Sequence, residues 1–123
     1  MQPIPALTAA TEVARAVAQV ELQLTSAFGL NLAEALTLCA VAGEQLPATA
    51  VSDRTHLRPS HLSKVIAAMR RRNLLTTTRT KADRRLRLLS LTAAGTELVA
   101  TLRTHPFLIP PLLRPLSKHL QKG

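Results

Sequence analysis

Aromatic residues are almost absent from this chain of 123 residues, which has no Trp, no Tyr and only two Phe. This scarcity disfavours RNA-binding modules that stack bases on aromatic side chains, and it also disfavours cofactor sites lined by aromatic rings. The single cysteine, Cys39, excludes an internal disulfide and a cysteine-based zinc site. We expect a reducing compartment, and because no secretory signal is evident, we expect a cytoplasmic protein.

Long apolar runs and catalytic patterns are missing as well. The most apolar stretch, Ala33 to Gly43, is too short to cross a bilayer and contains Glu34, so no membrane association is expected. There is no Gly-rich phosphate loop, no Ser/His/Asp set and no paired carboxylates, and the histidines lack metal-ligand spacing. We therefore expect a protein that is not an enzyme and that holds neither a metal nor a cofactor.

Acidic residues are scarce in the middle of the chain, where positive charge gathers. Between Arg54 and Arg87 there are eleven Lys or Arg residues and one acid, Asp83. Residues 1–53, in contrast, hold one base against five acids, and residues 88–123 hold four bases against one acid. Positive charge concentrated within a folded segment most often serves a polyanion, because each neutralised phosphate releases condensed counterions.

Length and composition predict a single globular domain over residues 1–123. Apolar periodicity, prolines at helix starts and capping residues predict a mainly α fold with a small β-hairpin. Four prolines between Pro106 and Pro115 predict short, broken helical turns at the end of the chain. The predicted elements are helices over 8–27, 32–41, 48–54, 59–72 and 93–102, and strands over 76–78 and 86–91.

The order of these elements predicts a winged helix-turn-helix. Two short helices joined by a tight turn, the second with a polar outer face, are typical of a helix-turn-helix. In the second of these helices, Leu62, Val65, Ile66 and Met69 are expected in the core. The basic segment 79–85, between the two predicted strands, is then the wing.

The stretch Leu30 to Leu102 resembles the MarR family of bacterial transcriptional regulators. Asp83-Arg84-Arg85 followed by Leu91-Thr92-Ala93-Ala94-Gly95 is similar to that family's wing signature, and helix 59–72 running into Asn73-Leu74-Leu75 is similar to its recognition helix. The sequence departs from the family at Asn73 and His56, where Gly is usual, at Arg58, where Ser or Thr is usual, and in its proline-rich tail. The resemblance implies a regulator that binds double-stranded DNA.

Candidate DNA contacts follow from this architecture. The first turns of helix 59–72 would enter the major groove, and the wing would reach the minor groove. We further hypothesise that the Asp83 carboxylate holds the Arg85 guanidinium in an ion pair and so directs it into the minor groove. The alternative is a hairpin tip in which Asp83 stabilises the turn and the arginines stay solvated. The candidate residues are Arg58, Ser60, His61, Ser63, Lys64, Arg71, Arg79, Lys81, Asp83, Arg84 and Arg85.

One protomer offers few base contacts, so a homodimer is expected. The DNA-binding core is predicted at about 30–102, and segments 1–28 and 98–123 are the candidate dimer surface. Cys39 is expected to be buried, without a neighbouring cation and without a sensor role. The function predicted is a dimeric, sequence-specific repressor, for which a small-molecule effector stays open. The alternative is a basic winged helix that binds RNA, a ribosome or a protein partner.

Overall fold

The computed structural model describes residues 2–121 of the chain, with side chains described through His119. Two compact units are present: the first combines Met1–Leu30 with Pro106–Gly123, and the second is Asn31–His105. The second unit contains the predicted helix-turn-helix and wing. It also takes in residues 98–105, which the sequence had assigned to the dimer segment, because the helix that contains them packs on other elements of this unit.

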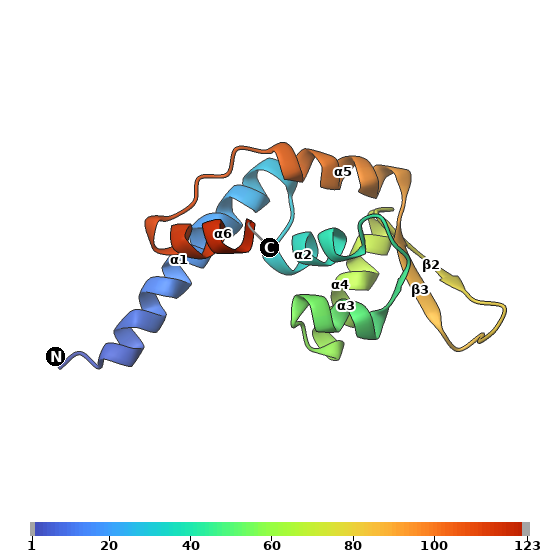
Figure 1. The fold of residues 1–123 in the computed structure, drawn as a ribbon, viewed down its shortest axis with the longest axis horizontal. Helices are drawn as coiled ribbons and strands as arrows, with labels where there is room; N and C mark the ends of the chain where they lie inside the picture. The colour runs from blue at the N-terminus through green and yellow to red at the C-terminus, as the bar shows by residue number, and fades with distance from the viewer. Residues whose placement is uncertain (1, 122–123) are drawn as a thin grey trace. The chain divides into compact units, whose positions relative to one another are not determined.

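The second unit is built from four helices and three strands around one apolar core (Figure 1). Leu38, Val41, Val51, Leu62 and Met69 are fully buried and join three of the helices. Its elements are α2 (Leu32–Val41), β1 (Leu46–Pro47), α3 (Ala48–Thr55), α4 (Pro59–Arg71), β2 (Leu75–Arg79), β3 (Arg87–Leu91) and α5 (Ala93–Thr104).

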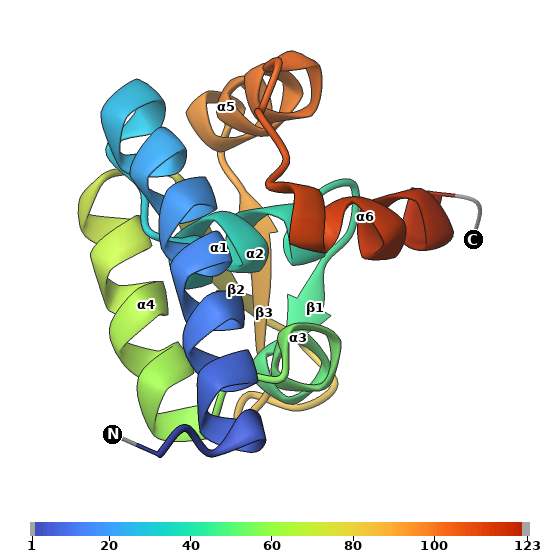
Figure 2. The ribbon, with the colours of Figure 1, turned by 90° about the vertical axis from the view of Figure 1, so that its left-hand side faces the viewer.

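The strands form an antiparallel sheet in the order β1-β3-β2, so β3 is the central strand (Figure 2). The predicted hairpin is confirmed, and its register pairs Leu75 with Leu91 and Arg79 with Arg87. The sequence missed β1, which pairs Leu46 with Leu89. A two-residue strand that ends in proline has no alternation to detect, and proline is accepted there because β1 lies at an edge of the sheet.

Helix ends in this unit follow local sequence signals. Asn31 and Glu34 form a capping box, in which the Glu34 amide donates to Asn31 Oδ1 at 2.8 Å and the Asn31 amide donates to Glu34 Oε1 at 2.9 Å. His56 and Asn73, which follow α3 and α4, have left-handed φ values of 61° and 58°. Asn accepts this conformation more readily than most residues, as predicted for the end of α4. Arg58 supplies no side-chain cap to α4.

Thr92 joins the end of α4 to the start of α5. Its hydroxyl donates to the carbonyl of Asn73 at 2.7 Å and accepts from the amide of Gly95 at 3.0 Å, and its own amide donates to the carbonyl of Leu74 at 3.1 Å. Gly95 is buried against Leu74, and a Cβ at this position would overlap the Leu74 carbonyl oxygen. The Leu-Thr-x-x-Gly sequence is therefore a packing motif that fixes the base of the hairpin.

The first unit consists of a long helix and the end of the chain. It comprises α1 (Pro5–Phe28), a short 3₁₀ helix, η1 (Pro111–Leu113), and α6 (Arg114–Gln121). Gln23 of α1 binds the backbone of Leu108 twice: its Nε2 donates to the carbonyl at 2.8 Å, and its Oε1 accepts from the amide at 2.7 Å. The rings of Phe28 and Phe107 also lie against each other, with centroids 6.3 Å apart.

Much of the apolar surface of the first unit is exposed. Only Ala16 and Leu24 are buried along the 24 residues of α1. Exposed large apolar side chains lie on α1, on the residue just before it and on the C-terminal segment: Ile4, Leu7, Val13, Leu22, Leu108, Ile109, Leu112 and Leu116.

Among the described residues, no single helix is long and apolar enough to cross a membrane. Within the described residues, α1 and α2 reach that length and hydropathy when they are counted together.

Candidate nucleic-acid interface

Helix α4 is amphipathic, with one apolar side and one polar side. Leu62, Val65 and Met69 are buried on one side. Residues at steps of three and four along the opposite side share a face, because an α-helix has 3.6 residues per turn. The predicted DNA-contacting residues of this region are all exposed, and they belong to the first two turns or to the residue just before the helix: Arg58, Ser60, His61, Ser63 and Lys64.

Ile66 does not lie in the core, contrary to the sequence-based expectation. Its side chain is half-buried and lines two adjoining grooves, one between α3 and α4 and one between α4 and the sheet. The three-and-four spacing of apolar residues was correct, but Ile66 falls at the margin of the apolar stripe. There it belongs as much to the exposed face as to the buried one.

The tip of the hairpin is held by a local network of hydrogen bonds. Thr80 Oγ1 donates to the carbonyl of Asp83 at 2.8 Å and accepts from the Asp83 amide at 2.9 Å. The carbonyl of Asp83 also accepts from the amide of Leu86 at 3.1 Å. The Asp83 carboxylate accepts from the backbone amide of Arg85 at 3.0 Å, which is an Asx turn.

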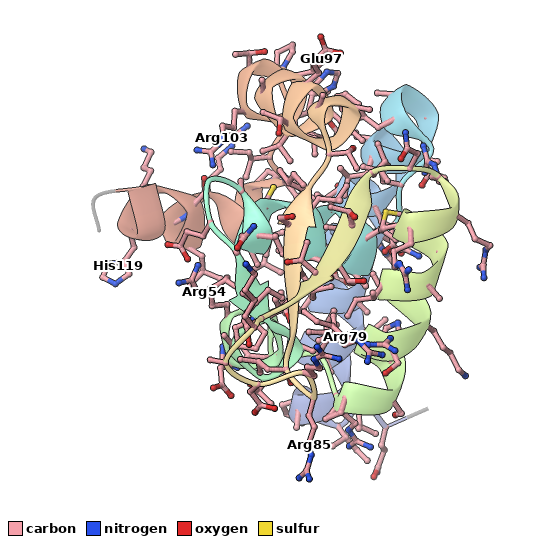
Figure 3. All side chains as sticks on the ribbon, turned by 90° about the vertical axis from the view of Figure 1, so that its right-hand side faces the viewer. Arg54, Arg79, Arg85, Glu97, Arg103 and His119 are labelled. Carbon is pink, nitrogen blue, oxygen red and sulfur yellow. The ribbon has the colours of Figure 1, made fainter. Side chains whose placement is uncertain are left out.

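This geometry corrects the proposed ion pair between Asp83 and Arg85. Within the described part of the chain, no ion pair joins these two side chains. The Asp83 carboxylate binds the backbone because the amide of Arg85 is within reach of its short side chain. An ion pair would instead restrict the rotamers of the long arginine side chain. The Arg85 guanidinium instead points outward from the wing (Figure 3). The other predicted wing residues, Arg79, Lys81 and Arg84, are exposed as well.

Arg87 was missed as a candidate. It pairs directly with Arg79 across the hairpin, so both side chains leave the sheet on the same side. That side also carries Thr77 and Leu89, which line a groove with Ser63 and Ile66 of α4. Like charges opposite each other destabilise a sheet. The arginine pair therefore concentrates positive charge on the side of the hairpin that faces α4, and the register supplies the signal that could have found Arg87.

Arg54 begins the basic stretch but is used within the fold. One of its terminal nitrogens lies 3.1 Å from a carboxylate oxygen of Glu44, and the other donates to the carbonyl of Ala40 at 3.1 Å. These two contacts tie α3 to the end of α2 and to the loop before β1. Because Arg54 is paired with Glu44, it adds less to the exposed positive charge of this unit than its place in the sequence suggests.

Arg71 lies apart from the other predicted contacts. It is exposed at the C-terminal end of α4, about 17 Å along the helix from Ser60 at 1.5 Å per residue. Arg70, Asn73 and Thr76 share an open depression of about 630 Å³ with it. A basic residue at this helix end is also favoured by the helix dipole, so its exposure alone assigns it no role on DNA.

Cys39 is exposed, so the expectation of a buried cysteine was wrong. Helix α2 is apolar around nearly its whole circumference, so the sequence alone could not show which face of the helix is exposed. Partial desolvation raises the pKa of the Cys39 thiol, and the nearby Arg103 cation opposes part of this rise in pKa. The sequence-based expectation of no neighbouring cation was therefore also wrong. No group of three or more His, Cys, Asp or Glu in the described residues is placed to hold a metal ion.

Comparison with known proteins agrees with this geometry. The winged helix DNA-binding domain family matches residues 30–95. No curated protein matches the chain. Among solved structures, BpsR from Bordetella bronchiseptica, whose DNA binding is regulated by 6-hydroxynicotinic acid, is 24% identical with a TM-score of 0.71, and the match covers 98% of this chain and 91% of BpsR.

Two further structures match over nearly all of the chain. AbsC from Streptomyces coelicolor, a MarR family transcriptional regulator, is 22% identical with a TM-score of 0.69 and is covered completely, as is this chain. MepR from S. aureus, solved as a DNA complex, is 13% identical with a TM-score of 0.74, and the match covers 98% of this chain and 85% of MepR. The chain therefore belongs to the winged helix DNA-binding domain family and has the fold of the MarR-family transcriptional regulators.

Proposed function

We propose that this protein is a dimeric, sequence-specific repressor that reads the major groove with α4 and reaches the minor groove with the wing. One observation carries the proposal. The eleven candidate residues are all exposed, and ten of them lie at the first two turns of α4 or on the hairpin of one winged-helix unit. Because α4 and the hairpin belong to the same compact unit, one polyanion would contact both of them.

The polar face of α4 suits recognition of base edges. An α-helix fits the width of the major groove of B-DNA, and its first turns lie closest to the bases in a winged helix. Lys64 can donate to the O6 and N7 acceptors of guanine, and the hydroxyls of Ser60 and Ser63 can donate or accept with several bases. Arg58, immediately before the helix, is placed for a phosphate.

The wing suits the minor groove. Arg85 points outward from the hairpin, and a narrow A·T-rich minor groove attracts an inserted guanidinium. Arg79, Arg84 and Lys81 would then neutralise flanking phosphates. Asp83 keeps the tip in shape from within, because its carboxylate is engaged with the Arg85 amide.

Dimer formation is supported by the exposed apolar side chains of the first unit. Leu22 is 67% exposed, Leu112 is 52% exposed and Leu116 is 59% exposed. Apolar residues exposed in this number along one helix and one terminal segment mark an interaction surface. A second copy of the chain would cover them and would present two recognition helices to half-sites about 10 base pairs apart. A dimer bound across a promoter would exclude RNA polymerase, and this is the physical basis for proposing repression.

Binding should be measured by fluorescence anisotropy with duplexes selected from a random library, over a series of salt concentrations. Arg84→Ala should reduce the magnitude of the slope of log K against log salt by about 1, since one phosphate contact is lost. Arg54→Ala is the matched control, because Arg54 is paired with Glu44, and the slope should stay unchanged.

The alternative functions make different predictions for the same assay. Structured RNA that competes with the selected duplex at equal concentration would favour the RNA-binding alternative. Weak and equal binding to every duplex would reduce the protein to a non-specific phosphate binder. A promoter reporter carrying the selected site should be silenced when the protein is expressed, and activation of the reporter would contradict repression.

A further inference from the structure

An apolar surface lies beside the polar face of α4. The proposed hydrogen bonds to bases and phosphates do not involve it. Ile66 forms its centre, half-buried and open to two adjoining grooves of about 290 Å³ each. Ala48, at the start of α3, and Ser63, one turn before Ile66 on α4, line both grooves. An apolar side chain at this place favours a ligand with an apolar group, because burying that group against Ile66 removes apolar surface from water and stabilises binding.

The surroundings of this surface favour a DNA base as the occupant. Arg70 and Arg87 line the groove between α4 and the sheet, so an anionic backbone is attracted to its edges. Asp53 lines the groove between α3 and α4, so a phosphate is disfavoured there. Within DNA, the C5-methyl group of thymine is the apolar group of a base that the major groove exposes.

We infer that Ile66 is a specificity-determining residue that contacts the C5-methyl group of a thymine, with Ala48 forming the adjacent wall. The inference rests on the proposed function, since it requires α4 to lie in the major groove. It adds a thymine at a fixed position of each half-site to the contacts that Ser60, Ser63 and Lys64 supply. In a symmetric dimer the same thymine occurs twice, once in each half-site.

The decisive experiment removes one methyl group from the DNA and one side chain from the protein. Each thymine of a duplex selected by the wild-type protein is replaced in turn by deoxyuridine, which keeps base pairing and loses only the methyl group. One thymine in each half-site should show a loss of affinity of about fourfold on replacement, the value of one buried methylene-sized group. With Ile66→Ala, affinity for the thymine duplex should fall, and replacement of that thymine should have no further effect.

Controls separate lost recognition from lost folding. Ile66→Val keeps an apolar β-branched side chain and should retain most of the sensitivity to deoxyuridine. Leu88→Ala is a matched truncation, because Leu88 is half-buried but leaves the sheet on the face opposite to Leu89. Leu88→Ala should respond to deoxyuridine as the wild type does. Thermal melting of each variant confirms that the folded protein is compared.

The outcomes distinguish this inference from the proposed function. Selective binding to the thymine duplex with no sensitivity to deoxyuridine at any position would overturn the inference and leave the proposed function intact. A deoxyuridine effect that persists unchanged in Ile66→Ala would also overturn it, because another residue would then contact the methyl group. Equal binding of the wild type to all duplexes would overturn both the inference and the proposed function.

Discussion

Asp83 shows how one acid fits within a basic surface. A carboxylate that faces a phosphate would weaken DNA binding by repulsion. The Asp83 carboxylate, however, accepts a hydrogen bond from the Arg85 amide at 3.0 Å, and the Asp83 backbone is hydrogen-bonded to the Thr80 hydroxyl. A shaped tip lowers the entropy that the wing must lose when it binds. Asp83 therefore favours DNA binding by shaping the wing tip, and this effect offsets the repulsion between its charge and the phosphates.

Substitution at Asp83 should separate these two effects. Asp83→Ala removes one turn hydrogen bond, a net contribution of about 1 kcal/mol, so affinity for the selected duplex should fall about fivefold. Binding to random DNA at low salt should rise slightly, because a negative charge is gone. Anisotropy titrations with both duplexes measure the two effects. Asp83→Asn keeps the oxygen acceptor and should retain selective affinity, and equal losses for Asn and Ala would contradict the capping role.

Cys39 should react slowly despite its exposure. The thiolate is the reactive form, and a raised pKa means that less thiolate is present at neutral pH. Alkylation by iodoacetamide at pH 7.5 should be slower in the folded protein than in the protein unfolded in urea, with a pH midpoint above that of an ordinary cysteine. Arg103→Ala should slow alkylation further, because the cation that opposes the rise in pKa is removed. A faster reaction in the folded protein would contradict this assignment.

At the scale of elements, the base of the hairpin depends on the close approach of α5 to the end of α4. Gly95→Ala would place a methyl group on the Leu74 carbonyl, and we expect a loss of at least about 2 kcal/mol in the free energy of unfolding. Urea denaturation measures this loss. Ala94→Ser is the control, since it also adds one heavy atom but at an exposed position of α5. Similar stabilities for the two variants would contradict the close approach.

Most elements were predictable because their signals are local. The Asn31 capping box, the left-handed Asn73 and the Thr92 cap each depend on residues a few positions apart. β1 was not predictable, because Leu46 and Pro47 become a strand only when β3 is beside them. Long-range pairing of this kind leaves no pattern in a two-residue segment.

The candidate site was predictable as a set of exposed residues but not in its detailed contacts. All eleven candidates are exposed, as their polarity indicated. The position of Ile66 at the edge of the α4 stripe, the Asx turn of Asp83 and the pairing of Arg54 with Glu44 depend on neighbours that only the folded chain supplies. Charge counted along the sequence therefore overstated the surface available to DNA.

At the scale of the whole molecule, the proposed dimer should dissociate when its apolar surface is charged. Leu112→Asp combined with Leu116→Asp places carboxylates where exposed leucines now lie. Size-exclusion chromatography with light scattering should then report a monomer in place of a dimer, and affinity for a two-half-site duplex should fall more than affinity for a single half-site. Thr96→Asp, exposed on α5, is the control and should leave the dimer intact. A monomeric wild-type protein would contradict the dimer.

The pairing of Gln23 with Leu108 has a consequence for synthesis of the chain. The two residues are 85 positions apart, and the whole winged-helix unit lies between them in sequence. At roughly 5–20 residues per second on the ribosome, α1 waits about 4–17 s before Leu108 is made. The winged-helix unit, being contiguous, is complete before the helix that precedes it finds its partner. Helix α1 precedes the winged-helix unit in sequence but is thus secured after it, and the exposed leucines of α1 are open to chaperones throughout that interval.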